Sequence, residues 1–209
     1  MSLCAGLGRR SLVLSMDQWA DVQGGVYQSN TPAATGAMKA VCSFVELGAG
    51  WGYLLHDMVD RFQVLMYAMA GLGNTPGTWT AAECWTPGAF SSGYAVPSQT
   101  VLPTFLRWQL LFEDPFVKTL WIARATPRTW LATGKTAVAL KNAPTSYGRL
   151  SFVLQAIDAT AIHANVTLGA AFRWPVGGLT LRLRSPRYPS TKISGVTVGG
   201  APFTSFNGE

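Results

Sequence analysis

The sequence is poor in ionisable side chains and in the residues that commonly hold metals or act as nucleophiles. Charged residues make up 12% of the 209 positions, with two histidines and three cysteines. Cys4, Cys42 and Cys84 stand alone and are odd in number, so their spacing gives neither a zinc site nor a disulfide framework. Neither His56 nor His163 belongs to a motif around a nucleophile. We therefore expect no metal and no cofactor.

The sequence also lacks the long runs that mark membranes and nucleic-acid binding. No stretch approaches the roughly 20 apolar residues that a membrane-spanning helix needs. Residues 1–15 hold two arginines before a short apolar run, which makes a poor signal peptide. The net charge is +6, but Lys and Arg are spread singly and form no recognisable motif. We expect neither a membrane nor a nucleic acid as partner, and no segment indicates a compartment.

What the chain does have is apolar and aromatic: 48% hydrophobic residues and eight tryptophans. Its charge is divided unevenly. Residues 1–112 carry five Lys/Arg against six Asp/Glu, whereas residues 113–209 carry eleven against four. Such an asymmetry between halves supports a boundary between them. We therefore predict two units, residues 1–114 and 115–209.

The two predicted units differ in hydrophobic period. Over residues 53–70 apolar side chains recur every three or four positions, which indicates a helix. A second helix is predicted over about 97–112, with a kink or late start at Pro103, and a weaker one over about 33–47. Short β-rich runs then alternate with turn signals, at 117–124, 136–141, 149–157, 162–168, 179–184 and 193–198. The pattern predicts an α+β fold in which helices precede an antiparallel β-sandwich.

Residues 75–85 combine two tryptophans, three threonines and one carboxylate in a connection between helices. Trp79 and Trp85 each offer a flat apolar face with one polar edge. Glu83 can donate or accept a proton. A sugar has apolar C–H faces and a hydroxyl rim, so this combination suits a glycan. A loop whose tryptophans fill the core fits the same residues and stays open as an alternative.

Hydrolysis of a glycosidic bond needs two carboxyl groups. The helical half supplies six candidates: Asp17, Asp21, Glu46, Asp57, Asp60 and Glu83. Asp57 and Asp60 lie three positions apart on one predicted helix and are most simply solvated. Glu83 is the best candidate because its loop also carries the aromatic side chains. No second carboxylate stands out.

Several short segments occur in a familiar order: TPGTWT (75–80) before Glu83, YAVPSQ (94–99), LLFEDP (110–115), LWIA (120–123), ATPRTWL (125–131), NAPTSYG (142–148) and ISGVTVGG (193–200). Together they resemble the C-terminal part of large microbial glycosidase-like proteins of the six-hairpin class. In that class an (α/α)6 toroid holds the site and a β-sandwich follows it. The resemblance covers about residues 50–206.

The resemblance implies a carbohydrate-active protein of glycoside hydrolase type that acts on an oligo- or polysaccharide. With the local chemistry, it suggests Glu83 as the catalytic carboxylate and Trp79, Trp85, Thr78 and Tyr94 as substrate-binding residues. A toroid needs twelve helices, and residues 1–112 supply only about three to five. We therefore expect an incomplete toroid whose exposed apolar helical face favours self-association.

Other functions fit the same sequence. The chain could be a non-catalytic carbohydrate-binding or interaction module, or a structural remnant without activity. Some polysaccharide lyases use related helical toroids, and Tyr94 would be available there as the base. An arginine-lined cleft, which a lyase would use to neutralise a uronate, is not evident in the helical half.

Overall fold

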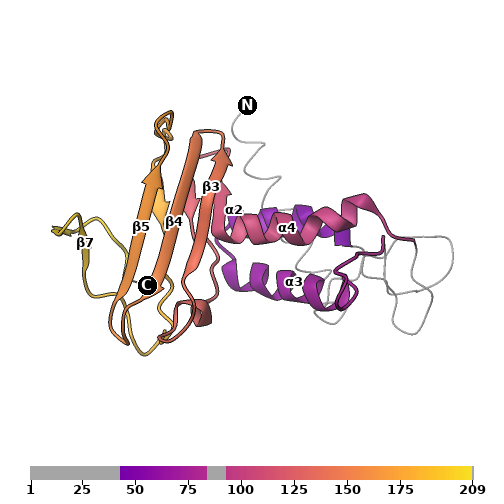
Figure 1. The fold of residues 1–209 in the computed structure, drawn as a ribbon, viewed down its shortest axis with the longest axis horizontal. Coiled ribbons are helices and arrows are strands. Elements are labelled where there is room, and N and C mark those ends of the chain that lie inside the picture. Colours follow the sequence, from indigo (N-terminus) through magenta and orange to yellow (C-terminus); the bar gives the residue numbers. More distant parts are fainter. Residues whose placement is uncertain (1–42, 84–92, 209) are drawn as a thin grey trace. The chain divides into compact units, whose positions relative to one another are not determined.

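The computed structural model describes residues 43–83 and 93–208. Three cysteines, Trp85 and most of the predicted helix at 33–47 lie outside these ranges. The protein is of mixed α+β class, with three α-helices in the described part followed by small, mainly antiparallel sheets (Figure 1). The chain divides into two compact units, and the boundary between them along the sequence lies between Gln109 and Leu110.

The first unit is helical. It contains a short 3-10 helix η1 (Ser43–Val45) and the helices α2 (Glu46–Leu55), α3 (Val59–Leu72) and α4 (Val96–Leu110). The periodicity over 53–70 predicted one helix, but the structure divides this stretch between α2 and α3. Asp57 adopts a left-handed conformation with φ of 61°, and Asp tolerates this region better than most residues do.

The end of α2 follows the hydrogen-bond pattern of a Schellman motif. The Asp57 N–H donates to the Leu54 carbonyl at 3.3 Å, and the Met58 N–H donates to the Tyr53 carbonyl at 2.8 Å. Both bonds occupy carbonyl groups that the helix leaves unpaired at its end. Apolar residues keep the same spacing on both sides of this turn, so periodicity alone could not reveal it.

Phe105 of α4 joins the three helices. A Cβ built on Gly50 of α2 would lie 2.5 Å from the Phe105 ring, so the two helices touch at this glycine. The Phe62 ring of α3 meets the Phe105 ring edge-on, with centroids 5.4 Å apart. Pro103 lies inside α4, which is assigned as one helix from Val96 to Leu110.

The second unit is built of short strands. Its elements are β1 (Leu111–Glu113), β2 (Leu120–Ile122), the 3-10 helix η2 (Arg128–Leu131), β3 (Val138–Thr145), β4 (Gly148–Ala156), β5 (Ile162–Leu168), β6 (Leu179–Leu181), β7 (Val196–Val198) and β8 (Ala201–Phe203). They form sheets in the orders β1-β2-β6, β3-β4-β5 and β7-β8. Figure 1 shows β3, β4 and β5 as adjacent long strands.

One strand pair departs from the antiparallel expectation. β2 and β6 pair in parallel, with Trp121 opposite Thr180. A parallel pair needs a long crossover connection, and the chain between these strands contains η2 and the whole β3–β5 sheet. The local turn signals predicted each strand without showing this long-range pairing.

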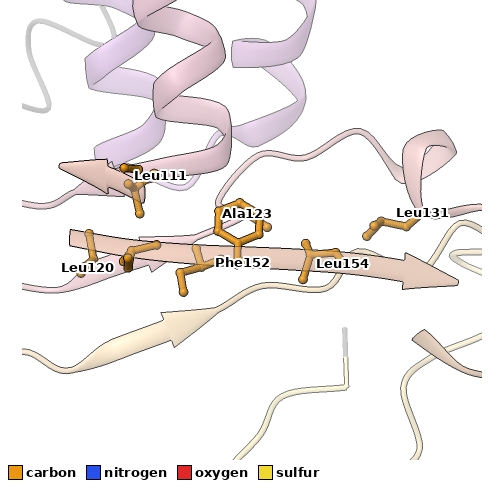
Figure 2. Close-up of a cluster of buried hydrophobic side chains, with 9 residues drawn as sticks. Leu111, Leu120, Ala123, Leu131, Phe152 and Leu154 are labelled. Carbon is orange, nitrogen blue, oxygen red and sulfur yellow. The ribbon is translucent and has the colours of Figure 1, made fainter. Parts of the chain in front are cut away.

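The core of the second unit is one cluster of buried apolar side chains. It includes Leu111, Leu120 and Ile122 from the first sheet and Phe152 and Leu154 from β4. Figure 2 shows the Phe152 ring beside Ala123, with Leu131 of η2 at one side of the cluster. β4 alternates between buried and more exposed residues, as expected for a strand with one face on a core. Both three-stranded sheets therefore contribute to the same core.

Candidate functional site

The segment here called the Trp79 loop, residues 74–83, begins directly after α3 and Gly73. Asn74 forms a β-bridge with Ala81, and the Thr75 N–H donates to the Thr80 carbonyl at 2.8 Å. Between these pairs the chain turns at Pro76 and Gly77. Proline followed by a glycine at positive φ, here 84°, is the sequence of a type II turn. The two ends of the loop are thus paired with each other.

Three threonine side chains tie the loop together. The Thr75 hydroxyl hydrogen-bonds with the Thr78 hydroxyl at 2.7 Å and also with the Thr80 hydroxyl. The hydroxyls of Thr78 and Thr80 are 3.1 Å apart. The Thr80 N–H donates to the Thr75 hydroxyl as well. Thr78 is exposed, so its hydroxyl can also exchange hydrogen bonds with a ligand.

Trp79 is presented to solvent by this loop. Its side chain is 57% exposed, so it does not fill the core as one alternative predicted. Its φ of 55° is unusual for a bulky residue, and such a conformation costs of the order of 1–3 kcal/mol. The Trp79 N–H donates to the Thr75 carbonyl at 2.9 Å, which helps to hold that conformation. Strain of this kind is often found at ligand-binding positions.

Glu83 and Tyr94 lie on two neighbouring extended segments. Ala82 forms an antiparallel bridge with Tyr94, and the Glu83 N–H donates to the Gly93 carbonyl at 2.9 Å. Both side chains are exposed, Tyr94 by 69%.

Two residues at the start of α4 form hydrogen bonds with the segment that contains Ala82 and Glu83. The Gln99 side-chain amide donates to the Ala81 carbonyl at 3.1 Å, and the buried Ser98 hydroxyl donates to the Glu83 carbonyl at 3.5 Å. The structure therefore brings four of the predicted site residues, Thr78, Trp79, Glu83 and Tyr94, onto one loop and the segment paired with it. Trp85, the fifth, lies outside the described residues.

The chain around this site is almost uncharged. From Phe62 to Leu106 the sequence contains no Lys, Arg or His, and Glu83 is its single carboxylate. Hydroxyls, aromatic rings and one carboxylate can bind a polyhydroxylated ring by stacking and hydrogen bonding. In the described parts of the chain, no three His, Cys, Asp or Glu residues lie together where they could hold a metal ion.

Glu46, the first residue of α2, is a buried carboxyl group that sequence reasoning did not single out. It is 3% exposed, and burial raises its pKa from 4.5 to about 8. Gly50 and Tyr53, four and seven residues after Glu46, are buried on the same helix, but this spacing alone does not show that a carboxyl group is buried with them. Glu46 is thus mainly protonated at neutral pH.

Comparisons with known proteins do not identify a function for this chain. No protein-family model, curated protein or solved structure matches this chain. Among residues 43–83 and 93–208, no helix has the length and apolar character to cross a membrane.

Proposed function

We propose that the chain is part of a carbohydrate-active protein of glycoside hydrolase type, and that the Trp79 loop contacts its oligo- or polysaccharide. The observation that carries the proposal is Trp79 itself. Trp79 is exposed, its backbone is held in a strained conformation, and its two sequence neighbours, Thr78 and Thr80, both carry hydroxyl groups. A tryptophan kept in this way offers a rigid flat face, which is the common means of stacking on a sugar ring.

Each neighbour has a defined role in this proposal. The Thr78 hydroxyl exchanges hydrogen bonds with the hydroxyl rim of the sugar, and Tyr94 supplies a second aromatic face or a phenolic hydrogen bond. Glu83 acts as the catalytic carboxylate, as proton donor or acceptor. Its backbone is fixed by Gly93 and Ser98, so its side chain starts from a defined position.

We also propose that the helices belong to an (α/α) toroid and that the strands form a supporting β-sandwich. Two observations support this arrangement. Helices α2 and α3 form a tightly linked pair against which Phe105 of α4 packs. The sheets β1-β2-β6 and β3-β4-β5 share one apolar core.

A non-catalytic carbohydrate-binding or structural module is the second candidate. Glu83 is the single acidic residue of the Trp79 loop, and glycoside hydrolysis requires two carboxyl groups. Binding needs only the aromatic and hydroxyl groups already on the loop. The two candidates therefore agree on the site and differ in whether a bond is broken.

The test compares Trp79→Ala with a matched surface change, Trp174→Ala, in the full chain. Trp174 is 68% exposed and belongs to the second unit. Affinity electrophoresis and calorimetry against soluble glycans should show that Trp79→Ala abolishes binding, whereas Trp174→Ala keeps it. Release of reducing ends that is lost in Glu83→Gln would identify a hydrolase. Binding without release would identify the module, and binding that depends on Trp174 alone would contradict the site.

A further inference from the structure

The charge of the Trp79 loop narrows the class of sugar that it can take. Proteins recognise a sugar carboxylate with cationic side chains, most often with the forked guanidinium of arginine. The sequence from Phe62 to Leu106, which contains the whole site, has no Lys, Arg or His. Glu83 is exposed on this loop and would repel a second carboxylate.

The aromatic residues also disfavour a sugar that carries a carboxylate. Trp79 and Tyr94 are both more than half exposed, and the face of an aromatic ring carries the negative part of its quadrupole. Such faces attract C–H groups and cations. The hydroxyls of Thr75, Thr78 and Thr80 are neutral and are hydrogen-bonded to one another. The exposed Thr78 hydroxyl can also form a hydrogen bond with a sugar hydroxyl, and it supplies no charge.

We propose that the Trp79 loop takes neutral or amino sugars and excludes uronic acids. The inference rests on the proposed function, since it specifies the ligand of the same site. A neutral ring stacks on Trp79 and shares hydrogen bonds with Thr78. A protonated amino group adds an ionic contact with Glu83, whereas a carboxylate at that place meets the like charge of Glu83.

The test uses the full chain at pH 6 and low salt with three tetrasaccharides: cellotetraose, a glucosamine tetramer and tetragalacturonate. Calorimetry should show cellotetraose binding about five- to tenfold more tightly than tetragalacturonate. The glucosamine tetramer should bind more tightly than cellotetraose, and added salt should remove this advantage.

Variants at Glu83 separate charge from shape. Glu83→Gln should remove the advantage of the glucosamine tetramer over cellotetraose, because the ionic contact is lost. Glu83→Lys should reverse the order of the two charged sugars. Asp60→Asn changes the net charge of the protein by the same amount as Glu83→Gln but lies on α3, so it should alter none of these preferences.

The outcomes distinguish this inference from the proposed function. If tetragalacturonate binds as tightly as cellotetraose and loses its binding in Trp79→Ala, the glycan site stands and the exclusion of uronic acids is wrong. If none of the three sugars binds at millimolar concentration, the proposed function fails and the inference fails with it. If the preferences survive Glu83→Gln and Glu83→Lys, charge at Glu83 does not select the ligand and the inference is overturned.

Discussion

Trp79 is large and aromatic, yet its position suggests a small role in stability. It is 57% exposed and its φ of 55° is unfavourable, so little burial free energy depends on the side chain. We predict that Trp79→Ala changes the free energy of unfolding by less than about 1 kcal/mol. Phe62→Ala is the matched truncation of a fully buried aromatic residue and should cost about 3–5 kcal/mol.

Urea denaturation followed by circular dichroism measures both variants. A loss of several kcal/mol in Trp79→Ala would mean that the indole is part of the core after all. It would also remove the main support for the proposed glycan site, since reduced binding could then reflect unfolding.

Glu46 makes stability depend on pH. Burial raises its folded-state pKa from 4.5 to about 8, so between these values the unfolded chain has released the proton and the folded chain has not. The free energy of unfolding therefore falls as pH rises through this window, by an amount of the order of 5 kcal/mol in total. The helix dipole at the start of α2 favours the charged form by only about 1 kcal/mol and does not offset burial.

The variant Glu46→Gln tests this linkage. It keeps the shape of the side chain and removes the ionisable group, so the variant should lose most of the decline between pH 5 and pH 8 and should be more stable than the original chain at pH 8. Thermal melts across that range provide the measurement. An unchanged slope would show that Glu46 ionises freely in the folded protein.

At the scale of elements, the contact between α2 and α4 depends on a glycine. A Cβ at Gly50 would lie 2.5 Å from the Phe105 ring, whereas a Cβ at Gly48 of the same helix has nothing within 4 Å. Gly50→Ala should therefore destabilise the protein by about 1–3 kcal/mol through overpacking. Gly48→Ala should stabilise it by about 0.5–1 kcal/mol, because alanine favours the helix more than glycine does.

If this packing is correct, denaturant titrations should show that the two alanine variants change the free energy of unfolding in opposite directions. Equal effects at both positions would mean that helix propensity alone decides, and that Phe105 can move away from Gly50 without cost.

The same elements show what the sequence could and could not predict. Alternation predicted strands that overlap β3, β4 and β5, because one face of each rests on a core and its period of two is local. The division at Asp57 was missed because the apolar spacing continues across it. The parallel pairing of β2 with β6 was missed because it joins distant segments, which no local pattern records.

The candidate site was predictable in its residue types and not in its exposure. Tryptophan, threonine and glutamate in residues 75–85 indicated sugar chemistry, but a tryptophan can equally fill a core. Whether Trp79 faces solvent depends on how the Thr75–Thr80 closure directs it. The burial of Glu46 likewise depends on helices that pack against α2, and its sequence neighbours alone do not reveal it.

For the whole molecule, the division at Gln109 and Leu110 leads to a test with fragments. Every buried residue of the core of the second unit, from Leu111 to Leu154, belongs to that unit. We predict that a fragment of residues 110–209 folds with a β-rich circular dichroism spectrum and a cooperative thermal transition.

A fragment of residues 115–209 is the matched control. It lacks β1 and with it Leu111, which is buried in the core and lies opposite Ile122 of β2. It should be less stable by at least about 2 kcal/mol, the value of one buried leucine. Equal stability of the two fragments would show that β1 belongs with the helices, and a longer fragment without structure would contradict the division.

The parallel pairing of β2 and β6 has a consequence for the order of folding. The meander β3-β4-β5 forms through neighbouring turns, whereas the segments that lead into β2 and β6 are joined by the hydrogen bond from Thr119 to Gly177, 58 residues apart. Closing the longer loop costs more entropy before any contact repays it. We expect the meander to form in the transition state and β6 to join it afterwards. Truncations in β4 should then slow refolding, whereas Leu181→Ala in β6 should mainly accelerate unfolding, as stopped-flow measurements can show.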